Sequence, residues 1–326
     1  MFTWQQAYEK INFWSINNIP FLVIIDFEGR FPVLLPLSEA AKNGIFYDFR
    51  GVTNAYAPPV LLPENIIFEK TPVDFSTYCS GWNKVMKGIR QGESYLLNLT
   101  FPTQINTNLT LKQIFSNSTA PYRLLFKDRF TFFSPEPFIR VTEFGEISTY
   151  PMKGTISANI PNADQILLND PKELAEHNTI VDLMRNDLGM HCRCVEVKKF
   201  RYLDRITTRN GDIFQTSSEI VGTSCSLTAG ILGDIIYNSL PAGSISGAPK
   251  ISTLKLISEA EIAPRGYYTG ICGIYDGCNF DSAVMIRFIE KKRGKFIFRS
   301  GGGITINSDV EKEYQEMIDK VYVPFI

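Results

Sequence analysis

Short apolar runs separated by turn residues dominate the N-terminal half of the chain, and this pattern predicts β-strands. The turns include Gly29 and Gly44. One stretch differs, because residues 75–91 have helical spacing, with Asp74 placed to cap the helix and Gly92 placed to end it. Strands are expected at 20–26, 30–35, 45–49, 95–101, 122–126, 129–133 and 138–141.

Helix signals are clearer in the C-terminal half. Asp170, Pro171 and Glu173 occupy the cap, first and third positions of a helix start, so a helix is expected from there to about Leu188. A second helix is expected at 249–262, where a proline stands at the start.

The last part of the sequence predicts an antiparallel meander followed by a helix. Apolar runs at 267–275, 282–290 and 295–300 are joined by short turns rich in Gly and Asn, which are too short for parallel crossovers. A capping box at 308–311 then opens a final helix with one apolar stripe.

These elements together indicate the α+β class, with antiparallel sheets packed on each other and helices outside. A length of 326 residues allows one large domain or two ordinary ones. The chain has no repeat, low-complexity tract or clear linker, so we expect a single domain over 1–326. Within it, residues 1–74 would form a short strand-rich part and residues 75–326 the core.

Composition narrows the classes of function. With 33 basic and 34 acidic residues the net charge is −1. The chain therefore lacks the excess of positive charge expected of a protein that binds nucleic acid or an anionic membrane. The N-terminus lacks the pattern of a signal peptide, and no apolar run is long enough to span a membrane, so a cytoplasmic protein is expected. The 6 cysteines form no C-x-x-C pair and are expected to be reduced. With only 2 histidines, a His-rich metal site is disfavoured.

Two pairs of carboxylates are the first candidate for chemistry. Glu173 and Glu176 lie three residues apart on one predicted helix, and Glu313 and Glu316 lie three apart on the last one. Residues at this spacing share a helix face. Several carboxylate oxygens brought together would suit Mg²⁺. The alternative is that these residues only interact with the positive ends of helices.

Three other segments could bind or attack a small anionic molecule. The three glycines at 301–303 could cup a carboxylate with their backbone N–H groups, or form only a flexible turn. The small-residue segment 243–250 enters a helix and is a generic anion site. Lys153 stands in a tight turn after a strand; a lysine there is usually solvated, and it becomes a nucleophile only in its neutral form.

Taken together, these segments resemble the chorismate-utilising enzymes. The resemblance rests on motifs that occur in the family's order and it covers about residues 75–326. The family includes component I of anthranilate synthase, component I of aminodeoxychorismate synthase, and the isochorismate and salicylate synthases. The motifs are SPE at 134–136, PMKGT at 151–155, the acidic helix at 173–189, GSISGAPK at 243–250, DSAVMIR at 281–287 and the segment 300–320.

Within the family the resemblance is to the aminodeoxychorismate branch, which acts in folate synthesis. That branch carries a nucleophilic lysine where this chain has Lys153, whereas anthranilate synthases typically have alanine there. Leu96 stands where isochorismate synthases carry a water-activating lysine, and leucine cannot act as a base. Gln215 and Ile274 depart from the family pattern. Two alternatives therefore stay open: an anthranilate synthase component I, and a non-catalytic chorismate-binding protein.

The resemblance also implies roles for individual residues. Lys153 would attack chorismate and Glu136 would protonate the departing hydroxyl. Mg²⁺ would be held by Glu176 and Glu316, with Glu173 and Glu313 beside them. Ammonia would come from a separate glutamine amidotransferase subunit, because neither histidine accompanies a nucleophilic cysteine. The implied substrate-binding residues are Thr155, Ser246, Gly247, Arg287, Gly301, Gly302, Gly303 and Lys320.

Overall fold

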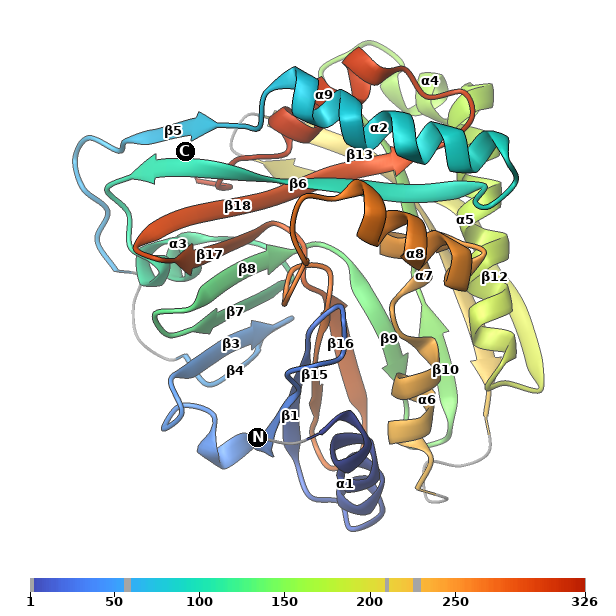
Figure 1. Ribbon diagram of the computed structural model, residues 1–326. Helices are drawn as coiled ribbons and strands as arrows, with labels where there is room; N and C mark the ends of the chain where they lie inside the picture. Colours follow the sequence, from blue (N-terminus) through green and yellow to red (C-terminus); the bar gives the residue numbers. More distant parts are fainter. Residues whose placement is uncertain (1–2, 56–59, 209–210, 225–229, 326) are drawn as a thin grey trace.

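The computed structural model describes residues 3–55, 60–208, 211–224 and 230–325. In this part of the chain two nine-stranded antiparallel sheets, here called sheet A and sheet B, pack on each other (Figure 1). Sheet A contains β1 (Phe21–Ile25), β2 (Val33–Pro36), β9 (Pro137–Val141), β10 (Glu146–Thr149), β11 (Met152–Ser157), β12 (Cys194–Thr208), β13 (Gly211–Thr223), β15 (Ile271–Tyr275) and β16 (Phe280–Val284). Sheet B contains β3 (Ile45–Phe49), β4 (Val52–Thr53), β5 (Phe68–Thr71), β6 (Leu96–Thr107), β7 (Tyr122–Phe126), β8 (Phe130–Ser134), β14 (Gly247–Ala248), β17 (Phe288–Lys292) and β18 (Lys295–Ile304).

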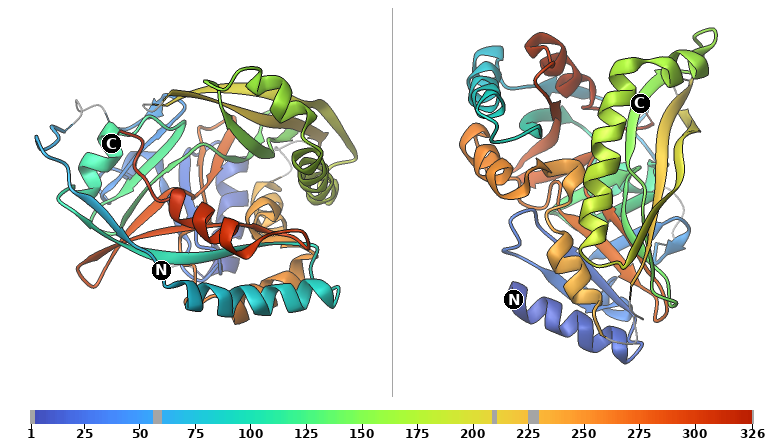
Figure 2. Two further views of the ribbon diagram at one scale, coloured as in Figure 1. Left: turned by 90° about the horizontal axis from the view of Figure 1, so that it is seen from above. Right: turned by 90° about the vertical axis from the view of Figure 1, so that its right-hand side faces the viewer.

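Helices cover the outer faces of the two sheets. Helices α2, α8 and α9 lie together on one side, whereas α5 runs beside the long β12–β13 hairpin (Figure 2). The helices are α1 (Trp4–Ile16), α2 (Phe75–Arg90), α3 (Leu111–Asn117), α4 (Ala163–Asn169), α5 (Pro171–Gly189), α6 (Leu232–Ser239), α7 (Gly243–Ser246), α8 (Lys250–Ala260) and α9 (Val310–Asp319), with a 3-10 turn at Leu37–Glu39.

Separate apolar clusters hold these layers together. Leu22 and Ile24 of β1 pack with Tyr47 of β3 and Phe132 of β8, and this cluster fills the space between the sheets. A second cluster joins sheet A to α1, α5 and α6, and a third joins sheet B to α2, α8 and α9. The predicted α+β arrangement, with packed antiparallel sheets and helices outside, is therefore confirmed.

Several predicted element boundaries are confirmed. The Asp74 side chain accepts a hydrogen bond from the backbone N–H of Thr77, and α2 begins at the next residue, Phe75. Asp170 accepts from the backbone N–H groups of Lys172 and Glu173 at the start of α5, as the sequence pattern predicts. These caps are local, which is why the sequence reveals them.

The prediction of one strand at 282–290 is wrong. The chain leaves sheet A at Val284 and enters sheet B at Phe288. Between them Arg287 adopts a left-handed backbone conformation, with φ of 52°. A break of this kind is needed because a strand that changes sheets must turn out of its ladder.

The glycines at 301–303 are not a turn. They continue β18 and pair with residues 98–100 of β6, so the strand predicted at 295–300 runs on to Ile304. A Cβ on Gly301 would lie 2.2 Å from the carbonyl oxygen of Leu99, so only glycine allows this close pairing. The glycines therefore extend a sheet, with one edge of β18 left unpaired beyond Arg299.

Other predictions near the chain ends need correction. The N-terminal part contains α1, which the pattern of strands did not predict; Thr3 and Gln6 form its capping box. The last helix is capped by Asp309, which accepts from the backbone N–H of Lys312, rather than by Ser308. Among the described cysteines, Cys79, Cys192, Cys194, Cys272 and Cys278 are free, and Cys225 lies outside the described residues.

Two neighbouring crossovers connect the sheets. Residues 135 and 136 link β8 of sheet B to β9 of sheet A, and residues 285–287 link β16 of sheet A to β17 of sheet B. The crossovers are hydrogen-bonded to each other, since Val284 donates to the Glu136 carbonyl and Phe133 donates to the Arg287 carbonyl. Polar side chains on these crossovers can therefore enter the space where the sheets meet.

Candidate active site

A cavity of about 260 Å³ lies at these crossovers. It brings together Glu136, Lys153, Arg287 and Lys320, which come from positions far apart in the sequence. A larger cavity of about 770 Å³ lies beside α3, but most of its lining is apolar side chains and lysines, and it contains none of the predicted site residues. Because the smaller cavity brings together the charged residues that the sequence predicts for the site, it is the candidate active site. The predicted residues that line it are Glu136, Lys153, Thr155, Arg287, Gly301, Gly303, Glu316 and Lys320.

Glu136 enters the cavity from the first crossover. Its Oε1 accepts a hydrogen bond of 2.6 Å from the Ser244 hydroxyl. Burial raises the pKa of Glu136, although the Ser244 hydrogen bond and the positive charges of Lys153, Arg287 and Lys320 oppose that rise. A carboxyl with a raised pKa suits the role of a general acid.

Lys153 reaches the cavity from β11. The pairing of β11 with β13 shifts register between Lys153 and Thr155, where Gly154 has φ of 76°. The backbone carbonyl of Lys153 accepts a hydrogen bond from Thr216, which anchors the bulge. The Nζ atom of Lys153 lies 3.6 Å from Glu176 Oε2. A Cβ on Gly303 would lie 3.2 Å from the same Nζ. The bulge and the missing side chain together let the amine extend towards β18.

The first carboxylate pair lies on α5, beside β11. Burial, and then the charge of Glu176, raise the pKa of Glu173. A Cβ on Gly154 would lie 2.7 Å from Glu173 Oε2, so this glycine makes room for the carboxylate. The two lysines contact different oxygens of Glu176: Lys172 Nζ is 3.7 Å from Oε1, whereas Lys153 contacts Oε2.

The second pair lies on α9, above β18. Burial, and then the charge of Glu316, raise the pKa of Glu313. Burial also acts on Glu316, but Lys320, Lys153 and Lys172 outweigh it and lower the pKa of Glu316. Gly302 leaves space for this pair, because a Cβ there would lie 3.0 Å from Glu313 Oε2.

The four carboxylates form two pairs rather than one cluster. In the part of the chain that the structure describes, no group of three or more His, Cys, Asp or Glu side chains lies close enough to hold a metal ion by itself. The oxygen donors in both pairs are nevertheless carboxylates. Besides burial, the charge of the neighbouring glutamate raises the pKa of Glu173 in the first pair and of Glu313 in the second. Mg²⁺ is usually bound by one or two carboxylates together with substrate groups and water. The residues present therefore fit such a site.

The remaining predicted residues divide into two groups. Lys320 Nζ donates to the Gly301 carbonyl at 2.9 Å and lies 2.5 Å from Glu316 Oε1, so it joins β18 to α9. Ser246 and Gly247 lie beside the cavity rather than along its wall. The Ser246 hydroxyl donates to the Ala242 carbonyl, and Gly247 pairs with Leu97 in the ladder of β14 and β6.

Sequence reasoning missed several residues that line the cavity. Ser244 lies inside the GSISGAPK motif, but its contact with Glu136 depends on tertiary structure. No local signal identifies Asn98, Tyr268, Thr269 or Arg299, which also line the cavity.

One histidine lies near the acidic helix motif but does not enter the cavity. His177 is fully buried, and its Nε2 is 2.6 Å from the Ser218 hydroxyl. Burial, with Arg201 and Lys153 nearby, lowers the pKa of His177 to about 4. It is therefore neutral near pH 7 and packs inside the fold.

Comparison with known proteins identifies the family. The sequence profile of the chorismate binding enzymes matches residues 50–325. The chain belongs to the chorismate-binding enzyme family. The predicted resemblance is thus confirmed, and the match begins earlier than residue 75. The chain is therefore a chorismate-utilising enzyme by family.

Individual members of this family differ in their named reactions. An uncharacterized PabA-like protein of Haemophilus influenzae is 50% identical over 322 residues, 99% of this chain and 97% of that protein. Aminodeoxychorismate synthase component 1 of Klebsiella aerogenes is 36% identical over 196 residues, 58% of this chain and 41% of that protein. The structure of anthranilate synthase component I from Streptococcus pneumoniae aligns with a TM-score of 0.66 and 26% identity, covering 80% of this chain and 62% of that one. No helix among the described residues is long and apolar enough to cross a membrane.

Proposed function

We propose that this chorismate-binding enzyme is component I of an aminodeoxychorismate synthase, acting in the cytoplasm. It would replace the C4 hydroxyl of chorismate with an amino group and so supply 4-amino-4-deoxychorismate for p-aminobenzoate and folate synthesis. The observation that carries the proposal is the side chain of Lys153, which lines the same cavity as Glu136. An amine in this position can act as a nucleophile towards the substrate ring.

The reaction proceeds in two displacements. Neutral Lys153 attacks C2 of chorismate, the ring double bonds shift, and the C4 oxygen leaves as water with the proton of Glu136. Ammonia then bonds to C4, the double bonds shift back, and the bond between C2 and Lys153 breaks. The added nitrogen loses one proton, which restores Glu136, so chorismate and ammonia give the amino product and water. Two such steps replace one difficult substitution.

The positive side chains of the cavity bind the carboxylates of the substrate. Arg287 and Lys320 both line the wall and come from different elements, the second crossover and the end of α9. Chorismate is a dicarboxylate, so two separate cations can fix both its position and its orientation. Gly301 and Gly303 also line the cavity along the edge of β18 that β17 leaves unpaired, so their backbone N–H groups can add to this binding.

The carboxylate pairs of α5 and α9 provide the metal ligands. Glu176 and Glu316 would hold Mg²⁺ directly or through water, with Glu173 and Glu313 beside them. When bound, the ion offsets the substrate's charge and orients its ring carboxylate. Lys172 contacts Glu176 and is largely exposed, so its side chain can move aside when the ion binds.

The ammonia comes from a separate glutamine amidotransferase subunit. A glutaminase site needs a cysteine nucleophile with a histidine base. His177 is buried against Ser218, and burial lowers the pKa of His191. Neither arrangement resembles a glutaminase pair, which supports a second subunit as the source.

The second candidate function is anthranilate synthesis. The similarity to the structure of an anthranilate synthase component I is the observation that favours it. In that reaction ammonia adds at C2 and pyruvate is lost. Lys153 occupies the cavity from which C2 would be attacked, so direct addition of ammonia at C2 is disfavoured. The test is to mix the protein with chorismate, Mg²⁺ and ammonium and to read the product's mass and ultraviolet spectrum.

A further inference from the structure

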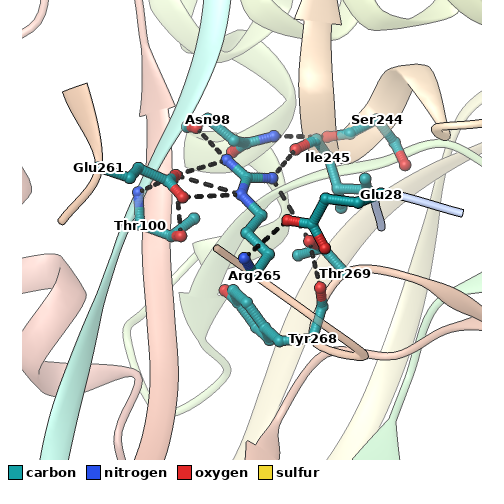
Figure 3. A network of polar contacts seen from close by, with 9 residues as sticks. All are labelled: Glu28, Asn98, Thr100, Ser244, Ile245, Glu261, Arg265, Tyr268 and Thr269. Carbon is teal, nitrogen blue, oxygen red and sulfur yellow. Dashed lines mark hydrogen bonds and ion pairs between the residues drawn. The ribbon is translucent and has the colours of Figure 1, made fainter. Parts of the chain in front are cut away.

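Arg265 is one of the largest fully buried side chains in the described part of the protein. It follows α8 and forms an ion pair with Glu261 (Figure 3). Arg265 Nη2 lies 2.7 Å from Glu261 Oε1, and only 1% of the arginine side chain and 4% of the glutamate side chain are exposed. The Phe27 ring packs 4.4 Å from the guanidinium carbon. The pair lies apart from the substrate cavity, since neither residue lines it.

The pair connects two elements that do line the cavity. Arg265 Nη2 donates to the Asn98 carbonyl on β6 at 2.6 Å, and Nη1 donates to the Ile245 carbonyl on α7 at 2.8 Å. Glu261 Oε1 accepts from both the backbone N–H and the hydroxyl of Thr100. A single planar group thus fixes the distance between β6 and α7.

The contacts continue from these elements to Glu136. Asn98 Nδ2 donates to the Ser244 carbonyl at 2.8 Å, which ties β6 to α7 a second time. Ser244 then donates its hydroxyl proton to Glu136 Oε1 at 2.6 Å. When Glu136 is protonated, its proton is expected on Oε2, because the carbonyl oxygen of a carboxylic acid is the better acceptor and Ser244 donates to Oε1.

We propose that Arg265 and Glu261 are positioning residues, which act through Asn98 and Ile245 to hold the Ser244 hydroxyl on Glu136 and so direct the acid proton from Oε2 towards the substrate. This inference rests on the proposed role of Glu136 as the general acid. A buried ion pair adds little net stability, since desolvation offsets its attraction. What it supplies here is a fixed geometry for two carbonyl groups.

The other charged groups that face Glu136 come from three elements. They are Lys153 of β11, Arg287 of the second crossover and Lys320 at the end of α9. Each is a cation that stabilises the ionised form of Glu136, and none is altered in the variants below. A change in kinetics on substituting Ser244 therefore reports the loss of its hydrogen bond.

The first test measures chorismate consumption at saturating ammonium, with both kcat and KM determined. Ser244→Ala is expected to lower kcat about tenfold with little change in KM, because the lost bond orients a proton rather than the substrate. Ser244→Thr keeps a hydroxyl and is expected to recover most of the loss. Ser239→Ala is the control, since that buried hydroxyl donates to the Ile235 carbonyl within α6. Wild-type kcat in Ser244→Ala would overturn the inference.

The second test asks whether Arg265 acts through Ser244. Arg265→Lys keeps the charge but cannot donate to both carbonyls. If the two residues act together, adding Ser244→Ala to Arg265→Lys lowers kcat little further. A full tenfold loss in both backgrounds would show that Arg265 acts elsewhere. Glu261→Gln weakens the ion pair that holds the guanidinium, and it serves in the same cycle if Arg265→Lys does not fold.

These outcomes separate the inference from the proposed function. The assay follows loss of chorismate, so it does not depend on which amino product forms. A wild-type protein that consumes no chorismate would contradict the proposed function, whereas unaltered kinetics in the Ser244 variants would contradict only the positioning role.

Discussion

Lys153 Nζ lies 3.6 Å from Glu176 Oε2, so the proposed nucleophile and a proposed metal ligand are direct neighbours. The two side chains are similarly shielded, with 24% and 22% of their surfaces exposed. The Glu176 carboxylate therefore holds the amine in place before substrate binds, and it is also proposed as a ligand of Mg²⁺.

The first prediction concerns this amine. Lys153→Ala is expected to lose the covalent adduct at C2 and most of the 4-amino product, because the proposed nucleophile is removed. A low level of C2 amination could then appear, since the smaller side chain opens the cavity to ammonia. Mass spectrometry of the intact protein after incubation with chorismate alone is expected to show an adduct in the wild type and none in the variant.

A matched control keeps this prediction specific. Lys87→Ala changes an exposed lysine on α2, far from the cavity, and is expected to leave turnover unchanged. Near wild-type production of the 4-amino product by Lys153→Ala would make Lys153 a bystander.

The second prediction concerns the metal. Glu316→Gln is expected to lower Mg²⁺-dependent turnover by at least about a hundredfold, because it removes a ligand charge from the site. Titration calorimetry with Mg²⁺ alone is expected to show weaker binding. Glu311→Gln, an exposed change on the same helix, is the control and is expected to behave as the wild type. Full activity in the presence of a chelator would count against any role for the ion.

The third prediction concerns repulsion within the first carboxylate pair. Because burial and Glu176 raise the pKa of Glu173, the ionised form is disfavoured in the folded protein. Glu173→Gln is therefore expected to raise the melting temperature of the metal-free protein at neutral pH. Calorimetry with and without Mg²⁺ checks this, and a lower melting temperature without metal would contradict it.

The fourth prediction concerns Glu136 and pH. Because its pKa is raised above the ordinary value of 4.5, the folded protein holds this proton more tightly than the unfolded chain. The stabilisation from the proton is complete below the ordinary pKa and is lost as pH rises through the raised one. Glu136→Gln is thus expected to be more stable than the wild type at pH well above the raised pKa, with the difference vanishing in acid. Thermal unfolding across that range measures this, and a difference that does not depend on pH would contradict it.

The same variant has a kinetic consequence. Without an acidic proton, Glu136→Gln is expected to lose about a hundredfold or more in kcat, which is the usual contribution of a general acid. Its circular dichroism is expected to match that of the wild type, so the loss would report chemistry and not folding.

The sequence predicts the parts of the fold that depend on contacts between neighbouring residues, and it misses parts that depend on contacts between distant segments. Asp74 and Asp170 cap their helices through contacts within three residues, and the sequence reveals them directly. The break at Arg287 could not be predicted, because it depends on two sheets meeting there. The strand through residues 301–303 was also missed, since its pairing with β6 outweighs the poor strand propensity of glycine.

The candidate site divides in the same way. Lys153 and Glu136 follow from the resemblance, and the structure brings both to one cavity. The bond from Ser244 to Glu136 and the bond from Arg265 to Asn98 each span more than a hundred positions in the sequence, so no local pattern indicates them. The sequence therefore does not indicate which residues hold the reacting groups in position.

The most direct test of the proposed function is to identify the product that the wild-type protein forms from chorismate and ammonium with Mg²⁺. We expect 4-amino-4-deoxychorismate, identified by its mass, with the enolpyruvyl group retained and no pyruvate released. Formation of anthranilate with an equal amount of pyruvate would contradict the proposed function.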